Sequence, residues 1–355
     1  MAYTTVDDGS EYFQTALYTG NQNASVAVVN DGNSDLQPDW VWGKNRDSDS
    51  NHWVVDSSRG VTKTLFPDLT SAEETQGSVN AFNTDGFTLG DWIGSTKTNE
   101  AYVAWQWKAN GGTTTDFSAS GNQLAGGFQA NTTAGFSIID YTSAGNSGKT
   151  IQHGLNSAPT FVLIKNRTDA SSWAVFHAKA QTSGAIRGKL NETDAFGSNT
   201  GIWNNTVPDS SNITLGNNDD VNSLSSGDVD PYICYAFHDV QGYSKFGSYT
   251  GNNNANGAFV YTGFKPAWLM VKRATDAARA WVIHDNTQDT FNVTANRLDA
   301  NTSEENQSSG HFDFLSNGFK CRSTEGATNA ASAYLYMAFA EHPFVSSQGV
   351  PTTAR

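Results

Sequence analysis

One motif occurs three times in this chain. It is an apolar run that begins with proline and ends in lysine and arginine, and a second run led by tryptophan follows each copy after a polar turn. The copies of the first run lie at 38–46, 159–167 and 266–273. The second runs begin at Trp53, Trp173 and Trp281, which are 120 and 108 residues apart. This period exceeds the roughly 20–50 residues of solenoids and propeller blades, so each copy is predicted to be a small domain.

The composition favours an all-β protein with very little helix. Charged residues make up 16% of the chain, whereas ordinary soluble domains have about 25%. Gly, Asn, Ser and Thr take their place, and these residues form turns between short strands. Aromatic residues make up 12% of the chain, which provides enough large apolar side chains for a packed core.

Each copy predicts the same order of short strands. A leading strand and a short second strand precede the proline-led strand and the tryptophan-led strand, and an aromatic strand closes the copy. The closing strands are expected at 101–107, 231–237 and 333–339. Six or seven strands in about 100 residues are typical of one β-sandwich. Ser/Thr followed by Glu three residues later predicts a helical turn at 71–74 and another at 302–305.

These copies divide the chain into tandem β-sandwich units. The predicted parts are an N-terminal arm (1–11), a first sandwich (12–109), a Gly/Thr-rich linker (110–133), a second sandwich (134–240), a third sandwich (241–345) and a C-terminal tail (346–355). Because the linker is rich in glycine and threonine, we expect it to be flexible and the first copy to be loosely attached. Copies two and three are joined by a short aromatic segment and are expected to pack as a rigid pair. Exchange of strands between copies stays open.

The charge and the termini exclude several classes of protein. A formal net charge of −14 disfavours binding to nucleic acid or to an anionic membrane surface, both of which attract basic proteins. No stretch approaches the roughly 18 apolar residues of a membrane span. The N-terminus has neither a basic nor an apolar segment of a signal peptide, so synthesis in the cytoplasm is expected. Cys234 and Cys321 are predicted to be buried free thiols.

The sequence favours a protein that is not an enzyme. It contains no Gly-x-Ser-x-Gly, His-Glu-x-x-His or Gly-x-Gly-x-x-Gly motif, and its seven histidines have no metal-ligand spacing. A glycosidase needs two carboxylates about 5–10 Å apart, and no strand carries several acidic residues on one face. We therefore expect no catalytic residues and no cofactor.

Residues that do not recur are the better candidates for binding. A tryptophan present in every copy is most simply explained as core, whereas Trp92 lies in a turn-rich loop without counterpart, and Trp203 lies in a similar polar setting. Both are candidate ligand contacts, with packing as the alternative. The acidic loops at Asp219, Asp220 and Asp228 are candidate calcium ligands, since calcium binds oxygen donors in loops. None has the spacing of an EF-hand.

Longer stretches resemble a known family. Segments 1–8, 12–21 and 37–42, and later 243–252, 312–320 and 337–344, are similar to a repeat family of unknown molecular function that is abundant among virion-protein genes of marine bacteriophages. The resemblance covers nearly the whole chain. It implies concanavalin-like or jelly-roll β-sandwiches in a phage structural protein, and it supplies no catalytic residues.

The resemblance implies a virion protein of tail fibre or spike type. Such a protein would be displayed on the particle, contact other virion proteins and bind a host-surface glycan or protein without cleaving it. A capsid decoration or fibre protein is one alternative, and a polysaccharide-cleaving enzyme is an alternative from another class. A homotrimer also stays open, since tail appendages are commonly trimeric, although no coiled-coil heptad demands it. The sequence alone leaves the receptor, the position in the virion and calcium binding undecided.

Overall fold

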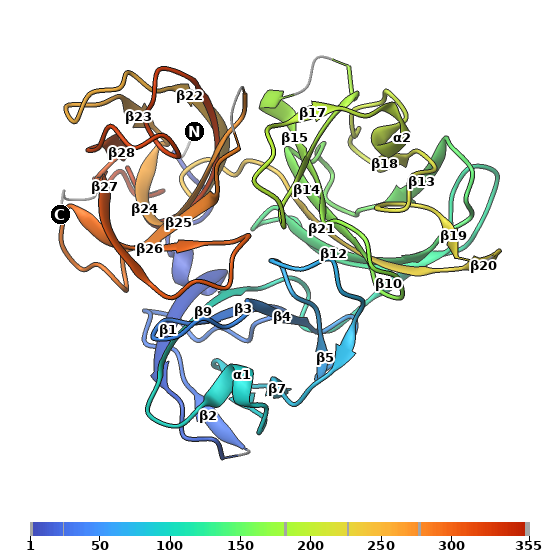
Figure 1. Cartoon of the computed structure of the whole chain (residues 1–355), viewed down its shortest axis with the longest axis horizontal. Coiled ribbons are helices and arrows are strands. Elements are labelled where there is room, and N and C mark those ends of the chain that lie inside the picture. Colours follow the sequence, from blue (N-terminus) through green and yellow to red (C-terminus); the bar gives the residue numbers. More distant parts are fainter. Residues whose placement is uncertain (1–2, 24, 181–182, 226, 276–277, 352–355) are drawn as a thin grey trace.

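The computed structural model of this chain describes residues 3–23, 25–180, 183–225, 227–275 and 278–351. The predicted all-β class is confirmed, because almost all regular structure is strand. The described helical elements are the short helices α1 (Ile93–Thr96) and α2 (Thr200–Trp203) and the 3-10 turns η1 (Gly9–Glu11) and η2 (Ala178–Ala180). Three lobes, here called the first, second and third units in chain order, lie around a common centre (Figure 1).

The first unit contains two facing sheets and a small strand pair. Its strands are β1 (Phe13–Thr19), β2 (Val26–Val28), β3 (Trp40–Asn45), β4 (Trp53–Asp56), β5 (Lys63–Thr64), β6 (Glu74–Thr75), β7 (Val79–Phe82), β8 (Phe87–Leu89) and β9 (Ala101–Trp107). One sheet has the order β1-β9-β3-β4 and the other β2-β8-β7, and β5 pairs with β6. Their facing side chains form a small core around Val41, Trp53 and Phe87.

The second unit repeats this plan and extends it at one edge. Its strands are β10 (Thr115–Phe117), β11 (Gly126–Asn131), β12 (Phe136–Thr142), β13 (Lys149–Gln152), β14 (Phe161–Asn166), β15 (Ala174–His177), β16 (Ile186–Lys189), β17 (Gly197–Ser198), β18 (Asn212–Leu215), β19 (Leu224–Ser225), β20 (Asp228–Val229) and β21 (Pro231–Phe237). The main sheet has the order β10-β11-β12-β21-β14-β15-β16-β17, and β13 pairs with β18 and β19 with β20.

The third unit forms one long sheet. Its strands are β22 (Ser244–Thr250), β23 (Phe259–Tyr261), β24 (Phe264–Arg273), β25 (Trp281–Asp285), β26 (Thr294–Asp299), β27 (Gln307–Leu315), β28 (Gly318–Cys321) and β29 (Ala333–Pro343). Their order is β22-β29-β24-β25-β26-β27-β28-β23. Strands β27 and β28 also contact β24, so the two halves of the sheet pack against each other as a sandwich.

The same pairing order recurs in all three units. The leading strand pairs with the closing strand, which pairs with the proline-led third strand, which pairs with the fourth: β1-β9-β3-β4, β12-β21-β14-β15 and β22-β29-β24-β25. A stacked tyrosine pair joins the leading and closing strands each time. The pairs are Tyr18 with Tyr102, Tyr141 with Tyr232, and Tyr249 with Tyr334, with ring centroids 5.0, 5.3 and 5.0 Å apart.

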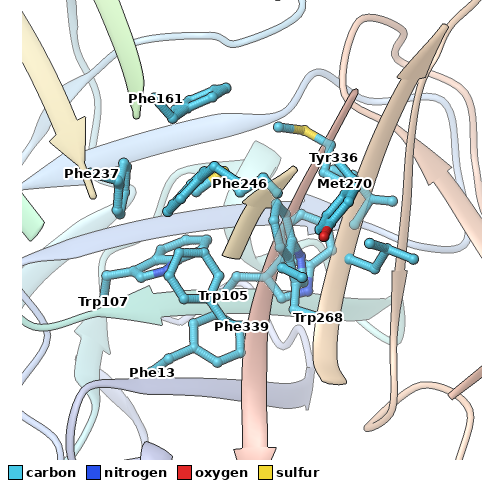
Figure 2. Packing of buried hydrophobic residues seen from close by; sticks show 14 of the residues in the cluster. Phe13, Trp105, Trp107, Phe161, Phe237, Phe246, Trp268, Met270, Tyr336 and Phe339 are labelled. Atoms are coloured by element: carbon cyan, nitrogen blue, oxygen red, sulfur yellow. The ribbon is translucent and has the colours of Figure 1, made fainter. Parts of the chain in front are cut away.

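One aromatic core at the centre is shared by the three units. Successive side chains of a strand point to opposite faces, so these sheets place one set of residues in their own sandwich and the other set at the centre. Figure 2 shows the central set, with Phe13 and Trp107 from the first unit, Phe161 and Phe237 from the second, and Trp268 and Phe339 from the third. The Trp107 and Trp268 rings meet edge to face at 5.7 Å. The first unit is therefore not the loosely attached copy that the sequence predicted.

Equivalent hydrogen bonds join each unit to the next. In each unit, one ring side chain lies opposite the last lysine of the third strand and donates its N–H to a backbone carbonyl oxygen of another unit. His52 Nε2 of the first unit donates to Asp299 of the third at 3.1 Å. Trp173 Nε1 of the second unit donates to Phe66 of the first at 2.8 Å, and Trp281 Nε1 of the third donates to Lys189 of the second at 2.9 Å. Backbone bonds recur at the same three boundaries in the opposite direction: the amides of Glu73, Phe196 and Asn306 donate to the carbonyls of Arg167, Ala274 and Arg46. The units are thus related by an approximate threefold rotation.

The strand register shows that the first copy was aligned one residue out of step with the other two. Trp281 pairs with Lys272, whereas Trp53 pairs with Gly43, the residue before Lys44. His52 therefore occupies the position that Trp173 and Trp281 hold in the other units. Trp53 faces its own sandwich core, while Trp173 and Trp281 belong to the central core.

The predicted flexible linker at 110–133 contains strands β10 and β11 instead. These strands extend the second unit's sheet beyond β12. Buried Asp39 of the first unit accepts hydrogen bonds from the amides of Ala109, Gly111 and Gly112 at 2.7, 2.9 and 2.9 Å. The glycines form a tight turn here, since Gly111 and Gly112 both have positive φ. The segment 110–133 is therefore attached to the first unit through Asp39 and to the second unit through strands β10 and β11.

The helical turns expected at 71–74 and 302–305 were wrong. Glu74 belongs to β6, and 302–305 has no regular structure. Glu73 forms salt bridges with Arg59 (3.1 Å) and Arg167 (2.9 Å), so an ion-pair network rather than a capping box accounts for this glutamate. None of the described helices has the length and apolar character needed to cross a membrane.

Candidate binding surfaces: Trp92 and the groove along strand β1

Trp92 is a half-exposed side chain of the first unit that packs against its neighbours. It precedes α1, and its ring centroid lies 6.0 Å from that of Phe66 in an edge-to-face contact. The ring also covers Gly94, where a Cβ would lie only 2.2 Å from it. Its neighbours Asp91 and Ile93 are exposed. An indole held in place and open on one side is suited to stacking on a flat ligand.

Trp203, the other predicted ligand contact, is core. Its side chain is fully buried and meets the ring of Phe176 edge to face at 5.6 Å. It belongs to the sandwich core of the second unit. The polar residues beside Trp203 in the sequence suggested an exposed loop. The short helix α2 instead buries Ile202 and Trp203 on one face.

The predicted calcium ligands do not come together. Asp220 is buried and accepts hydrogen bonds from Arg187 (2.8 Å) and from the amide of Ser172 (2.9 Å), while burial raises the pKa of its carboxyl group. Asp219 and Asp228 are exposed, the latter on strand β20. Over the described ranges of the chain, no three His, Cys, Asp or Glu side chains are grouped so that they could hold a metal ion.

An extensive hollow lies between the first and third units. Two adjoining hollows of about 230 and 620 Å³ share the lining residues Asp31, Asn286, Thr287 and Glu341, so they form one groove. Strand β1 forms one wall with Thr15 and Leu17. The other wall consists of β24, β29 and the loop after β25. We call this feature the β1 groove.

Strand β1 presents an open edge to this groove. Among the described strands its only sheet neighbour is β9. Lys108 donates to the carbonyl of Tyr12 (3.0 Å) and Gly20 to that of Glu100 (2.8 Å), which places the even-numbered residues of β1 in hydrogen-bonded pairs with β9. In an antiparallel pair the intervening residues direct their N–H and C=O groups away from the partner. The peptide groups of Thr15 and Leu17 therefore face the groove.

Polar side chains hold both walls in place. Gln14 donates to the carbonyls of Ser10 (2.9 Å) and Ser34 (2.7 Å) and accepts from the amide of Gly32 (2.9 Å). Opposite, Glu341 pairs with Lys265 at 3.0 Å and accepts from Asn286 at 2.5 Å.

The Oγ1 of Thr15 is buried, with the residue only 8% exposed, and has no hydrogen-bond partner within the described chain. A buried hydroxyl without a partner costs free energy until a ligand or water satisfies it.

The groove is acidic and has an apolar rim. The carboxylates of Asp8, Asp31 and Glu341 line it, and the amine of Lys265 is already paired with Glu341. Leu17 and Val29 line the wider hollow and are 40% and 63% exposed. Phe291, next to the lining residue Thr290, is 82% exposed. Exposed apolar side chains beside a polar groove are typical of an interaction surface.

Sequence reasoning missed this groove entirely. Thr15 and Glu341 lie at opposite ends of the chain, and each belongs to an ordinary strand pattern. Only the approach of the first and third units makes them neighbours. A partial signal was Leu17, an apolar residue that the strand places at the surface.

The structure is that of an all-β protein of three joined units, with candidate binding surfaces at its periphery and between units. The chain belongs to a family described as a domain of unknown function, DUF7483, whose model matches residues 8–343. No curated protein and no solved structure matches it.

Proposed function

We propose that this protein is a bacteriophage virion structural protein of tail fibre or spike type that binds the host surface without enzymatic action. The resemblance of segments such as 12–21 and 243–252 to virion-protein repeats supports the virion part of the proposal. The three units joined by one core and by repeated cyclic hydrogen bonds form a rigid body suited to display on a particle.

The half-exposed Trp92 is the observation that carries the binding function. Its ring is held over Gly94 and against Phe66, so little conformational freedom is lost when a ligand stacks on it. The adjacent carboxylate of Asp91 is exposed and can accept hydrogen bonds from hydroxyl groups. A host glycan combines flat apolar ring faces with hydroxyl groups and suits this pair. The net charge of −14 favours an uncharged glycan over an acidic one.

Binding of the intact protein to host cells and to purified host-envelope glycan tests this proposal. Replacing Trp92 with alanine is expected to weaken binding at least tenfold. Val229→Ala, which removes an exposed apolar side chain in the second unit, is the matched control and should bind as the wild type does. Equal binding by the Trp92 variant would exclude this surface.

Cryo-electron microscopy of the particle tests the position in the virion. Hundreds of copies over the head would favour the capsid-decoration alternative over the tail. Oligosaccharide released from the glycan during incubation would instead favour the polysaccharide-cleaving alternative.

A further inference from the structure

The three boundaries between units carry equivalent edge strands, but one of these edges is filled. The leading strands are β1, β12 and β22, and β12 alone among them has a second described sheet neighbour, β11. The stacked tyrosine pairs align the three strands residue by residue. Tyr18 corresponds to Tyr141, so Thr15 and Leu17 of β1 correspond to Ile138 and Asp140 of β12.

The chain itself shows how such an edge is filled. Ile138 pairs with Gln129 of β11, and Asp140 pairs with Gly127, in antiparallel register. The added strand also contacts the neighbouring unit, because Gln129 donates to Ser57 (3.1 Å) and Ser58 (2.6 Å) of the first unit. Strand β11 therefore lies along the leading strand at the boundary between the first and second units. The β1 groove is the corresponding place at the boundary between the first and third units.

We propose that the β1 groove binds an extended peptide segment of a partner protein, which adds to the sheet as an antiparallel strand beside β1. The peptide groups of Thr15 and Leu17 point outward and supply the backbone hydrogen bonds of such a pairing.

The residues that line the β1 groove indicate which side chains a bound peptide should have. Side chains of an added strand alternate between two sides. The carboxylates of Asp8 and Asp31 favour lysine or arginine at alternate positions, and the exposed Leu17, Val29 and Phe291 favour apolar residues between them. A second copy of this chain is a poor occupant, because two chains of charge −14 repel each other. The partner is thus a basic and apolar alternating strand of another protein.

Leu17→Pro tests the backbone pairing directly. The amide of Leu17 faces the open edge, so proline removes a groove-facing donor while the hydrogen bonds to β9 stay. Leu17→Ala is the matched control, since it shortens the same side chain and keeps the amide. Near-ultraviolet circular dichroism checks that both variants keep the native packing.

The probe is a fluorescein-labelled octapeptide that alternates lysine and valine, with blocked ends, and binding to the full-length protein is followed by fluorescence anisotropy. We expect saturable binding that is weakened at least tenfold by Leu17→Pro and less than threefold by Leu17→Ala. Asp31→Asn should weaken binding several-fold. Hydrogen exchange measured by mass spectrometry should slow in residues 13–19 when the peptide is bound.

Two peptide controls separate strand pairing from attraction between charges. The same octapeptide with its four central amides N-methylated keeps its charge and cannot pair, and it should not bind. A peptide with four lysines followed by four valines should bind at least tenfold more weakly. Equal binding of the N-methylated peptide, unchanged binding to the Leu17→Pro protein, or no binding of the alternating peptide would each overturn the proposal.

The inference goes beyond the proposed host-surface function and fails separately from it. Trp92→Ala should leave peptide binding unchanged, and Leu17→Pro should leave host-glycan binding unchanged. If glycan binding is lost in Leu17→Pro while the peptide does not bind, the groove is a glycan site and the strand proposal is wrong.

Discussion

The indole Nε1 of Trp105 donates a hydrogen bond of 3.0 Å to Oδ2 of Asp285, from the closing strand of the first unit to the fourth strand of the third. The corresponding residues meet at the next boundary, where the hydroxyl of Tyr235 donates to Asp56 at 2.6 Å. At the third boundary the closing strand has Met337, which offers no side-chain donor. There the fourth strand ends in His177, whose Nε2 lies 3.2 Å from the carbonyl oxygen of Tyr336. The roles are thus reversed at this boundary: the fourth strand supplies the donor, and the closing strand supplies the acceptor.

Replacing Trp105 with phenylalanine should destabilise the protein by more than its loss of volume explains. The change leaves the buried carboxylate of Asp285 without one of its donors, which costs about 1–3 kcal/mol in addition to the smaller ring. Trp53→Phe is the control, because the Trp53 indole nitrogen has no partner within the described chain. The two free energies of unfolding, measured in urea, should differ by about that amount. Equal values would show that the bond contributes nothing.

The protein should lose stability as the pH falls from about 6.5 towards 4, partly through His177. Burial lowers the pKa of His177 to about 4 in the folded state, from the ordinary 6.5 of an exposed histidine. Below pH 6.5 the unfolded chain takes up a proton that the folded chain cannot, so each pH unit costs about 1.4 kcal/mol. At pH 4 the total loss from this group is about 3 kcal/mol.

His177→Gln isolates this contribution, since glutamine keeps an N–H donor but does not titrate. Urea unfolding at pH 7 and pH 4.5 should show a smaller pH dependence in the variant, by about 2–3 kcal/mol. The other buried histidines titrate in both proteins and cancel in the comparison. A pH dependence identical to that of the wild type would rule out His177 as a contributor.

Asp39→Ala should release the segment before β10. The Asp39 carboxylate accepts hydrogen bonds from the amides of Ala109, Gly111 and Gly112. Without it, limited proteolysis should cut within 109–114 at least tenfold faster than in the wild type. Asp116→Ala, at an exposed aspartate of β10, should be cut at the wild-type rate. Cleavage first at 239–247 in the variant would contradict this prediction.

The chain should be a monomer of 38.1 kDa in solution. The aromatic faces that a homotrimer of single sandwiches would use for assembly are already buried within one chain. Light scattering coupled to size-exclusion chromatography measures this directly. A mass three times larger would instead support the homotrimer left open by the sequence.

Much of the fold was predictable because the determining patterns are local. Apolar runs separated by Gly, Asn, Ser and Thr predict short strands, and their threefold recurrence predicts that the same pairing order is used again. The candidate sites were less predictable. Trp92 remained a surface residue, but Trp203 turned inward, because exposure depends on which sheet a side chain covers rather than on its neighbours in the sequence.

The sequence by itself determined the strands, the all-β class and the recurring motif. Only the tertiary structure decided which face of each strand meets which core, and it placed His52 rather than Trp53 in register with Trp173 and Trp281. The physical reason is the period of two along a strand: an alignment wrong by one residue exchanges the sandwich core for the central core. The β1 groove likewise needed the approach of the first and third units, since groups far apart in the chain are brought together by packing alone.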